Sequence, residues 1–410
     1  MNKTYHRLRG LIAAVALLLC APAPAQDASP MDRSVAQGKY LVDVGNCSSC
    51  HTQPGAAPFS GGVRFNSPFG VIYSSNITPD RGTGIGSWSA EDLRRAMHEG
   101  VAAGGRRLFP AFPYTSFTKV TDADVRAIYA YLRTVKPVRY SPPANGLLFS
   151  QRWALTAWNS LYFEEGRFSS NAAQSAEWNR GAYLVEGLGH CGACHTPRNA
   201  LMAEAADKAL EGGVLEERVA PGKFRRWSAV NLTSAKTGLA SWSVDALAKY
   251  LQTGYSARAG TFGPMNEVIV NGLMNLTPQD ARAMAVYLKS LPGREYSGER
   301  VSPDQIKAGE PIYKKRCEKC HLGSGRGGTF TGPPVAGSAV VQSDDPASLI
   351  NIILYGAEAP EDVALGGWET MKPYGDVLDD AQVAAVSNYV RGSWGNRARP
   401  VGTAEVAQQR

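Results

Sequence analysis

The sequence is poor in several features, and each shortage excludes a class of function. Charged residues make up 19% of the 410 residues and the formal net charge is only +7, so no basic region indicates a nucleic-acid partner. No run of 18 or more apolar residues follows residue 25, so no transmembrane helix is expected. No nucleophile–base pair, dinucleotide-binding loop or metalloprotease motif is present, which argues against catalysis by side chains alone.

Cysteine is also scarce, but six of the seven cysteines form three C-x-x-C-H motifs. The motif residues are Cys47, Cys50 and His51, Cys191, Cys194 and His195, and Cys317, Cys320 and His321. This spacing is the attachment signature of a c-type haem, in which each thiol forms a thioether to the haem and the histidine becomes the proximal ligand of the iron. The sequence therefore predicts three covalently bound haems c.

A zinc site or a redox dithiol would use the same residue types. Zinc needs further cysteine or histidine ligands, and outside the motifs the chain offers only Cys20, His6, His98 and His190. A redox dithiol predicts one motif in a thioredoxin-like setting and does not account for three copies. Haem attachment is the interpretation that uses every motif.

Residues 1–25 have the three parts of a secretory signal peptide: a basic start, an apolar run and a small-residue end at Ala23-Pro24-Ala25. This predicts export to the periplasm. Cys20 could instead mark a lipoprotein, but Leu19 stands before it where a lipidation signal has a small residue. Cleavage after Ala25 would remove Cys20 and leave no cysteine for a disulfide.

A pair of helices is expected around each motif. The helix before the motif has a glycine and an aromatic residue: Gly38 and Tyr40, Gly181 and Tyr183, Gly309 and Tyr313. The later, amphipathic helices are expected at Asp122–Leu132, Gln279–Leu288 and Asp380–Val390. Because glycine lets a ring of the other helix approach the backbone, the pattern resembles the crossed first and last helices of class I cytochrome c. The predicted fold is mainly α, with three tandem class I cytochrome c domains.

The boundaries follow from composition. The aromatic-rich stretch after the first unit predicts a packed connector, and a short polar stretch before the third predicts a linker. The expected order is signal peptide 1–25, first cytochrome c unit 26–141, connector 142–172, second unit 173–292, linker 293–303, third unit 304–396 and C-terminal tail 397–410.

Methionine opposite histidine is the usual sixth ligand of a haem of raised potential. Met265 follows Gly263-Pro264 in a loop expected before the last helix of the second unit, and Met371 is the only methionine of the third unit. Both are predicted iron ligands.

The first unit lacks the corresponding sulfur. Its loop reads Phe109-Pro110-Ala111-Phe112-Pro113-Tyr114, and Phe112 cannot ligate iron. Met97 and His98 are the nearby donors. Three possibilities stay open: Met97 ligates, His98 ligates, or the sixth position is free, with Met97 in the core and His98 a solvated helix residue.

The three motifs, the repeated Asn76-Ile77-Thr78 and Asn231-Leu232-Thr233, the Phe112 loop and the terminal Asn388-Tyr389-Val390-Arg391 together resemble the trihaem cytochrome c subunit of membrane-bound bacterial dehydrogenases. That family serves gluconate 2-dehydrogenase and the related alcohol, sorbitol and fructose enzymes. The resemblance implies a dehydrogenase catalytic subunit and a small third subunit as partners, ubiquinone as acceptor, and attachment to the outer face of the cytoplasmic membrane through the complex.

Two other functions remain as alternatives at this point. Similar cytochromes accept electrons from molybdenum hydroxylases that act on aldehydes or N-heterocycles. A peroxidase-like haem enzyme could use an open first haem. In the main interpretation the chain transfers electrons and does not itself oxidise the substrate.

Overall fold

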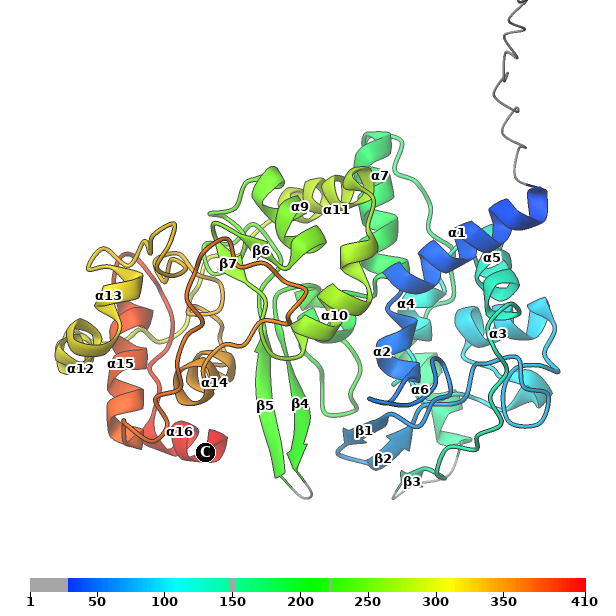
Figure 1. Cartoon of the computed structure of the whole chain (residues 1–410), viewed down its shortest axis with the longest axis horizontal. Helices are drawn as coiled ribbons and strands as arrows, with labels where there is room; N and C mark the ends of the chain where they lie inside the picture. The colour runs from blue at the N-terminus through cyan, green and yellow to red at the C-terminus, as the bar shows by residue number, and fades with distance from the viewer. Residues whose placement is uncertain (1–28, 148–151, 221–222) are drawn as a thin grey trace, which may run out of the picture.

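The computed structural model describes residues 29–147, 152–220 and 223–410. The predicted signal peptide, with Cys20, lies outside these residues. The described chain is mainly helical, as the sequence predicts, and three pairs of crossed helices lie in a row from the N-terminal to the C-terminal part (Figure 1). None of the helices in the described ranges is long and apolar enough to cross a membrane.

The crossed pairs contain the helices that the sequence predicts. The pairs are α1 (Pro30–Val44) with α5 (Asp122–Leu132), α7 (Ala176–Tyr183) with α11 (Pro278–Ser290), and α12 (Pro303–Arg316) with α15 (Asp380–Gly392). Each of the six helices begins after a residue whose side chain accepts a hydrogen bond from the backbone of the first turn: Ser29, Thr121, Ser175, Thr277, Ser302 and Asp379.

A glycine lies at the centre of each crossing. A Cβ at Gly38 or Gly181 would lie 1.9 Å from a carbonyl oxygen of the opposite helix, and one at Gly309 would lie 2.0 Å away. No side chain fits at such a distance, so only glycine permits this approach. The expected role of these glycines is confirmed at all three crossings.

Shorter elements surround the first motif. A three-stranded antiparallel sheet packs there, and its third strand comes from the expected connector. The elements are α2 (Cys47–His51), β1 (Arg64–Ser67), β2 (Gly70–Tyr73), α3 (Ala90–Glu99), α4 (Tyr114–Phe117), β3 (Gly146–Leu147) and α6 (Ala154–Tyr162).

The second unit contains a long hairpin that the sequence reasoning missed. Strands β4 (Gly213–Ala220) and β5 (Lys223–Ala229) pair antiparallel and project beyond the helices (Figure 1). Glu216 lies opposite Arg226 and Glu217 opposite Arg225, so the register brings together opposite charges. The other elements are a π-helical turn at Leu184–Leu188, α8 (Gly192–His195), α9 (Val244–Thr253), β6 (Tyr255–Ser256), β7 (Ala259–Gly260) and α10 (Met265–Asn271).

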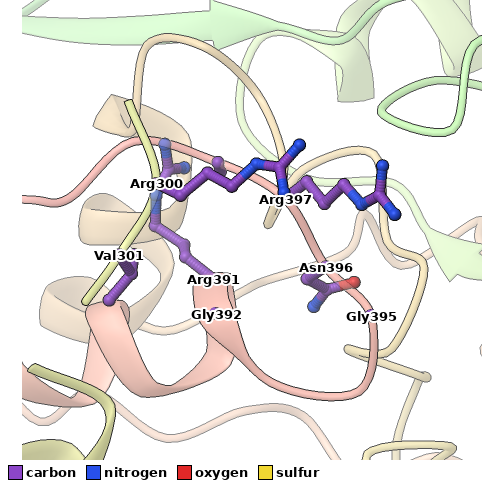
Figure 2. A pocket seen from close by; sticks show the side chains of 8 residues that line it. Arg300, Val301, Arg391, Gly392, Gly395, Asn396 and Arg397 are labelled. Carbon is purple, nitrogen blue, oxygen red and sulfur yellow. The ribbon is translucent and has the colours of Figure 1, made fainter. Parts of the chain in front are cut away.

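The third unit contains α13 (Glu318–His321) and α14 (Ala347–Tyr355), and the expected tail 397–410 folds back onto it as α16 (Thr403–Gln409). Arg391 is fully buried and donates hydrogen bonds to the carbonyls of Val341, Ser343 and Arg399. Burial lowers the pKa of Arg391 to about 10. Figure 2 shows the surrounding pocket, whose lining includes Arg300, Asn396 and Arg397.

The buried core is continuous between the first two units, whereas the third unit has a core of its own. One segment of the third unit is an exception. Val363 belongs to the core of the first two units, and in Figure 1 the orange segment around it extends to β7 and α10. The third unit also contacts β5 through hydrogen bonds between Ser348 and Ser228.

Candidate functional site

Each C-x-x-C-H motif forms one short turn of helix, at α2, α8 and α13. A helical turn brings residues three and four positions apart to one face, so the first cysteine, the second cysteine and the histidine can reach the same group. None of the six motif cysteines forms a disulfide in the described part of the chain. Burial raises the pKa of Cys47 and Cys191 to about 12, and these apolar surroundings suit an uncharged thioether.

The three motif histidines share one arrangement. In each ring Nδ1 lies within hydrogen-bond distance of a backbone carbonyl: 2.6 Å from Ser75 for His51, 2.7 Å from Val230 for His195, and 2.8 Å from Pro333 for His321. A carbonyl can only accept, so Nδ1 carries the proton and Nε2 keeps its lone pair for a metal.

Burial lowers the pKa of all three histidines, which keeps the rings neutral near pH 7. A neutral imidazole with a fixed tautomer is the form that binds iron. The motif residues therefore fit a c-type haem at each of the three places, two thiols for attachment and one oriented nitrogen for the iron.

The second unit places Met265 at the start of α10. This differs from the expected loop, because Pro264 already has helical backbone angles (φ −59°, ψ −23°) and leads directly into the helix. Met265 is half-buried and packs against the shared core. Met284 is fully buried within α11, as a core residue would be.

Met371 lies at the edge of the core of the third unit. Its backbone forms an isolated antiparallel bridge with Ala357, and its half-buried side chain packs against that core. Both predicted methionines thus lie in segments that border the core of their unit.

The first unit has Met97 and His98 on α3, and both are buried. The exposed fraction of His98 is 0%, so the possibility that it is a solvated helix residue is wrong. The amphipathic helix turns position 98 inward, against the start of α5. Nδ1 of His98 lies 3.5 Å from a carboxylate oxygen of Asp122, and neither ring nitrogen has a hydrogen-bond partner in the described part of the chain. Burial, with the charge of Arg167, lowers the pKa of His98 to about 4.

Two of the motifs are neighbours in space. Asn271, which follows Met265 on α10, donates a hydrogen bond to Ser49 inside the first motif. Burial raises the pKa of Cys50 to about 11, and the nearby Cys194 of the second motif and Glu267 raise it further. Cys50 and Cys194 occupy the same position in their motifs, so corresponding ends of the first two motifs face each other.

Sequence reasoning missed the contacts between units. The third-unit segment 357–371 packs over the methionine side of the second unit: Asn266 donates a hydrogen bond to the carbonyl of Glu358, and the rings of Tyr255 and Trp368 lie 4.8 Å apart. A Cβ on Gly254 would lie 3.2 Å from Val363. The apolar character of Val363 and the aromatic ring of Trp368 were local signals of burial, but they do not identify the partner.

Residues 35–136 match the protein family described as "Cytochrome c", and residues 304–390 match the family described as "Cytochrome C oxidase, cbb3-type, subunit III". The chain is 36% identical to the gluconate 2-dehydrogenase cytochrome c subunit of Pantoea cypripedii, over 97% of this chain and 94% of the relative. It is 35% identical to the cytochrome c subunit of alcohol dehydrogenase (quinone) from Gluconobacter oxydans, over 95% of this chain and 84% of the relative.

A further relative is one of the subunits of nicotinate dehydrogenase from Pseudomonas putida, which is 40% identical over 87% of this chain. This chain spans only 30% of the length of that relative.

Proposed function

The chain belongs to the family of cytochrome c subunits of dehydrogenase complexes, and we propose that it carries three haems c and passes electrons from a partner dehydrogenase subunit to ubiquinone. The observation that carries this proposal is the repeated motif geometry, in which Nδ1 of His51, His195 and His321 meets a backbone carbonyl. The haems supply reversible one-electron chemistry when bound. The chain's own residues attach them, orient the histidines and exclude water.

The sixth ligands are part of the same proposal. Met265 and Met371 serve the second and third haems, since each is a half-buried thioether at the edge of its core. In the first unit Met97 or His98, both buried on α3, supplies the sixth ligand, or this position stays open.

We propose the partners that the cytochrome c subunits of this family have in their complexes. We place the mature chain in the periplasm, in a complex with the catalytic dehydrogenase subunit and a small third subunit, on the outer face of the cytoplasmic membrane. Two exposed apolar side chains support the membrane contact: the exposed fraction is 71% for Trp153, immediately before α6, and 70% for Leu161 on α6. Arg152 precedes Trp153 in the chain, and an exposed aromatic ring next to a cation suits the interface of an anionic bilayer.

A second candidate partner is supported by the similarity to a component of nicotinate dehydrogenase. Nicotinate is an N-heterocycle, so the electron donor of this chain could be a molybdenum hydroxylase in place of a flavoprotein or quinoprotein. The chain would perform the same electron transfer in both complexes. Identifying the dehydrogenase that co-purifies with it distinguishes the two.

The experiment begins with the haem content of the purified mature protein, by pyridine haemochrome assay and by mass. Three haems that acid–acetone does not extract are expected, and two or fewer after full maturation would refute the proposal. The partner dehydrogenase with its substrate should then reduce the haems, and a soluble ubiquinone should reoxidise them. Peroxide turnover by the isolated chain, without reduction by any dehydrogenase, would instead support the peroxidase-like alternative.

A further inference from the structure

The contact between the first two units near their motifs is formed by the residues that precede each motif. Gly45 and Asn46 precede the first motif, and Leu188, Gly189 and His190 precede the second. A Cβ on Gly45 would lie 3.2 Å from the side chain of Leu188, so the segments that precede the two motifs are in direct contact.

His190 extends from the second unit into the first. Its Nε2 lies 3.3 Å from the carbonyl oxygen of Gly45, and its ring meets that of Phe117 edge to face, with centroids 5.4 Å apart. Phe117 also contacts Phe112, at 5.3 Å, which is the side chain found where the other units supply methionine. A contiguous set of rings thus extends from the distal loop of the first unit to the residue before Cys191.

The backbone at this position does not require histidine. Asn46 and His190 each stand immediately before the first cysteine of a motif, and both have left-handed backbone angles, with φ of 51° and 36°. Asparagine adopts this conformation readily. Compared with asparagine, histidine adds a ring against Phe117 and a nitrogen that reaches Gly45.

We propose that His190 is a positioning residue, whose ring holds the second attachment motif against the first and thereby fixes the mutual arrangement of the haems bound at Cys50 and Cys194. This inference rests on the proposed function, because it requires a haem at both motifs. Electron transfer depends steeply on the distance and orientation of the two groups, so a fixed arrangement matters for an electron carrier.

The test is circular dichroism in the Soret region on the full-length, haem-loaded protein. Two neighbouring haems in a fixed arrangement couple their transitions and give a bisignate band. We expect this band in the wild type and its loss in His190→Asn, which keeps the left-handed turn but removes the ring. Haem content is measured on the same samples. A chain with fewer than three haems refutes the proposed function, whereas three haems without the expected change in the band refute only this inference.

Phe117→Leu tests the same contact from the first unit without altering the attachment loop, and it should also abolish the band. The matched control is Phe163→Leu, because Phe163 also makes an edge-to-face ring contact, in its case with Tyr114 at 5.1 Å. Its band should equal that of the wild type. No bisignate band in the wild type, an unchanged band in His190→Asn or Phe117→Leu, or an equal loss in Phe163→Leu would each overturn the inference.

Discussion

Replacing Gly181 by alanine should destabilise the folded protein, although alanine is the better helix former. In an open helix this substitution stabilises by about 1 kcal/mol. At the crossing of α7 and α11 the new Cβ would lie 1.9 Å from the carbonyl oxygen of Ala283, whereas ordinary contact begins at 3.4 Å. The helices would have to separate by roughly 1.5 Å, and overpacking of this kind costs about 1–3 kcal/mol. We expect a net loss of up to about 2 kcal/mol in the free energy of unfolding.

The assay is urea unfolding of the haem-loaded protein, followed by far-ultraviolet circular dichroism. Gly187→Ala is the control, because the nearest atom to its new Cβ would be Lys119 Cβ at 3.4 Å, an ordinary contact. That variant should be as stable as the wild type or slightly more stable. If Gly181→Ala proves at least as stable as Gly187→Ala, α7 and α11 do not approach each other so closely.

Three further predictions concern the haem ligands and the contact between units. Met265→Ala and Met371→Ala should each lower the reduction potential of one haem, because the thioether favours ferrous iron; unchanged redox titrations in both variants would show that other residues ligate. If the sixth coordination position of the first haem is open, carbon monoxide should bind one ferrous haem of three, and Phe112→Met should abolish that binding; a wild type that binds none points to Met97 or His98 as the ligand. Burial raises the pKa of Asp280, but hydrogen bonds from Arg180 and from a tyrosine of α1 lower it by more. This stabilisation is complete above the pKa of an unfolded aspartate and is lost as the pH falls through the lower folded pKa, so Asp280→Asn should show a flatter acid dependence of the urea midpoint.

The helices around the motifs could be predicted because their signals are local. Helix α5 begins at Asp122 and ends at Leu132, as its amphipathic pattern indicates, and Thr121 provides the cap. The repeated Asn-x-Thr segments of the first two units also form the same local structure. The side-chain oxygens of Asn76 and Asn231 each accept hydrogen bonds from the backbone and hydroxyl of a threonine two residues later.

Contacts between units could not be predicted, because periodicity along one helix does not identify the distant segment that covers it. The inward side of His98 faces the start of α5, which is distant in sequence, and the helical start at Met265 depends on the angles of Pro264. The sequence does contain a signal that predicts the β4–β5 hairpin. A Pro-Gly pair at 221–222 separates two charged stretches of opposite sign, around Glu216 and Arg226.

The segment 357–371 affects the order in which the protein can be completed during synthesis. Chains fold from the N-terminus as they emerge, and the second unit has all of its own helices once α11 is made. Its core nevertheless lacks Val363, which comes from the third unit much later. The side of the second unit near Met265 therefore stays uncovered until the segment 357–371 of the third unit has been added and has folded over it.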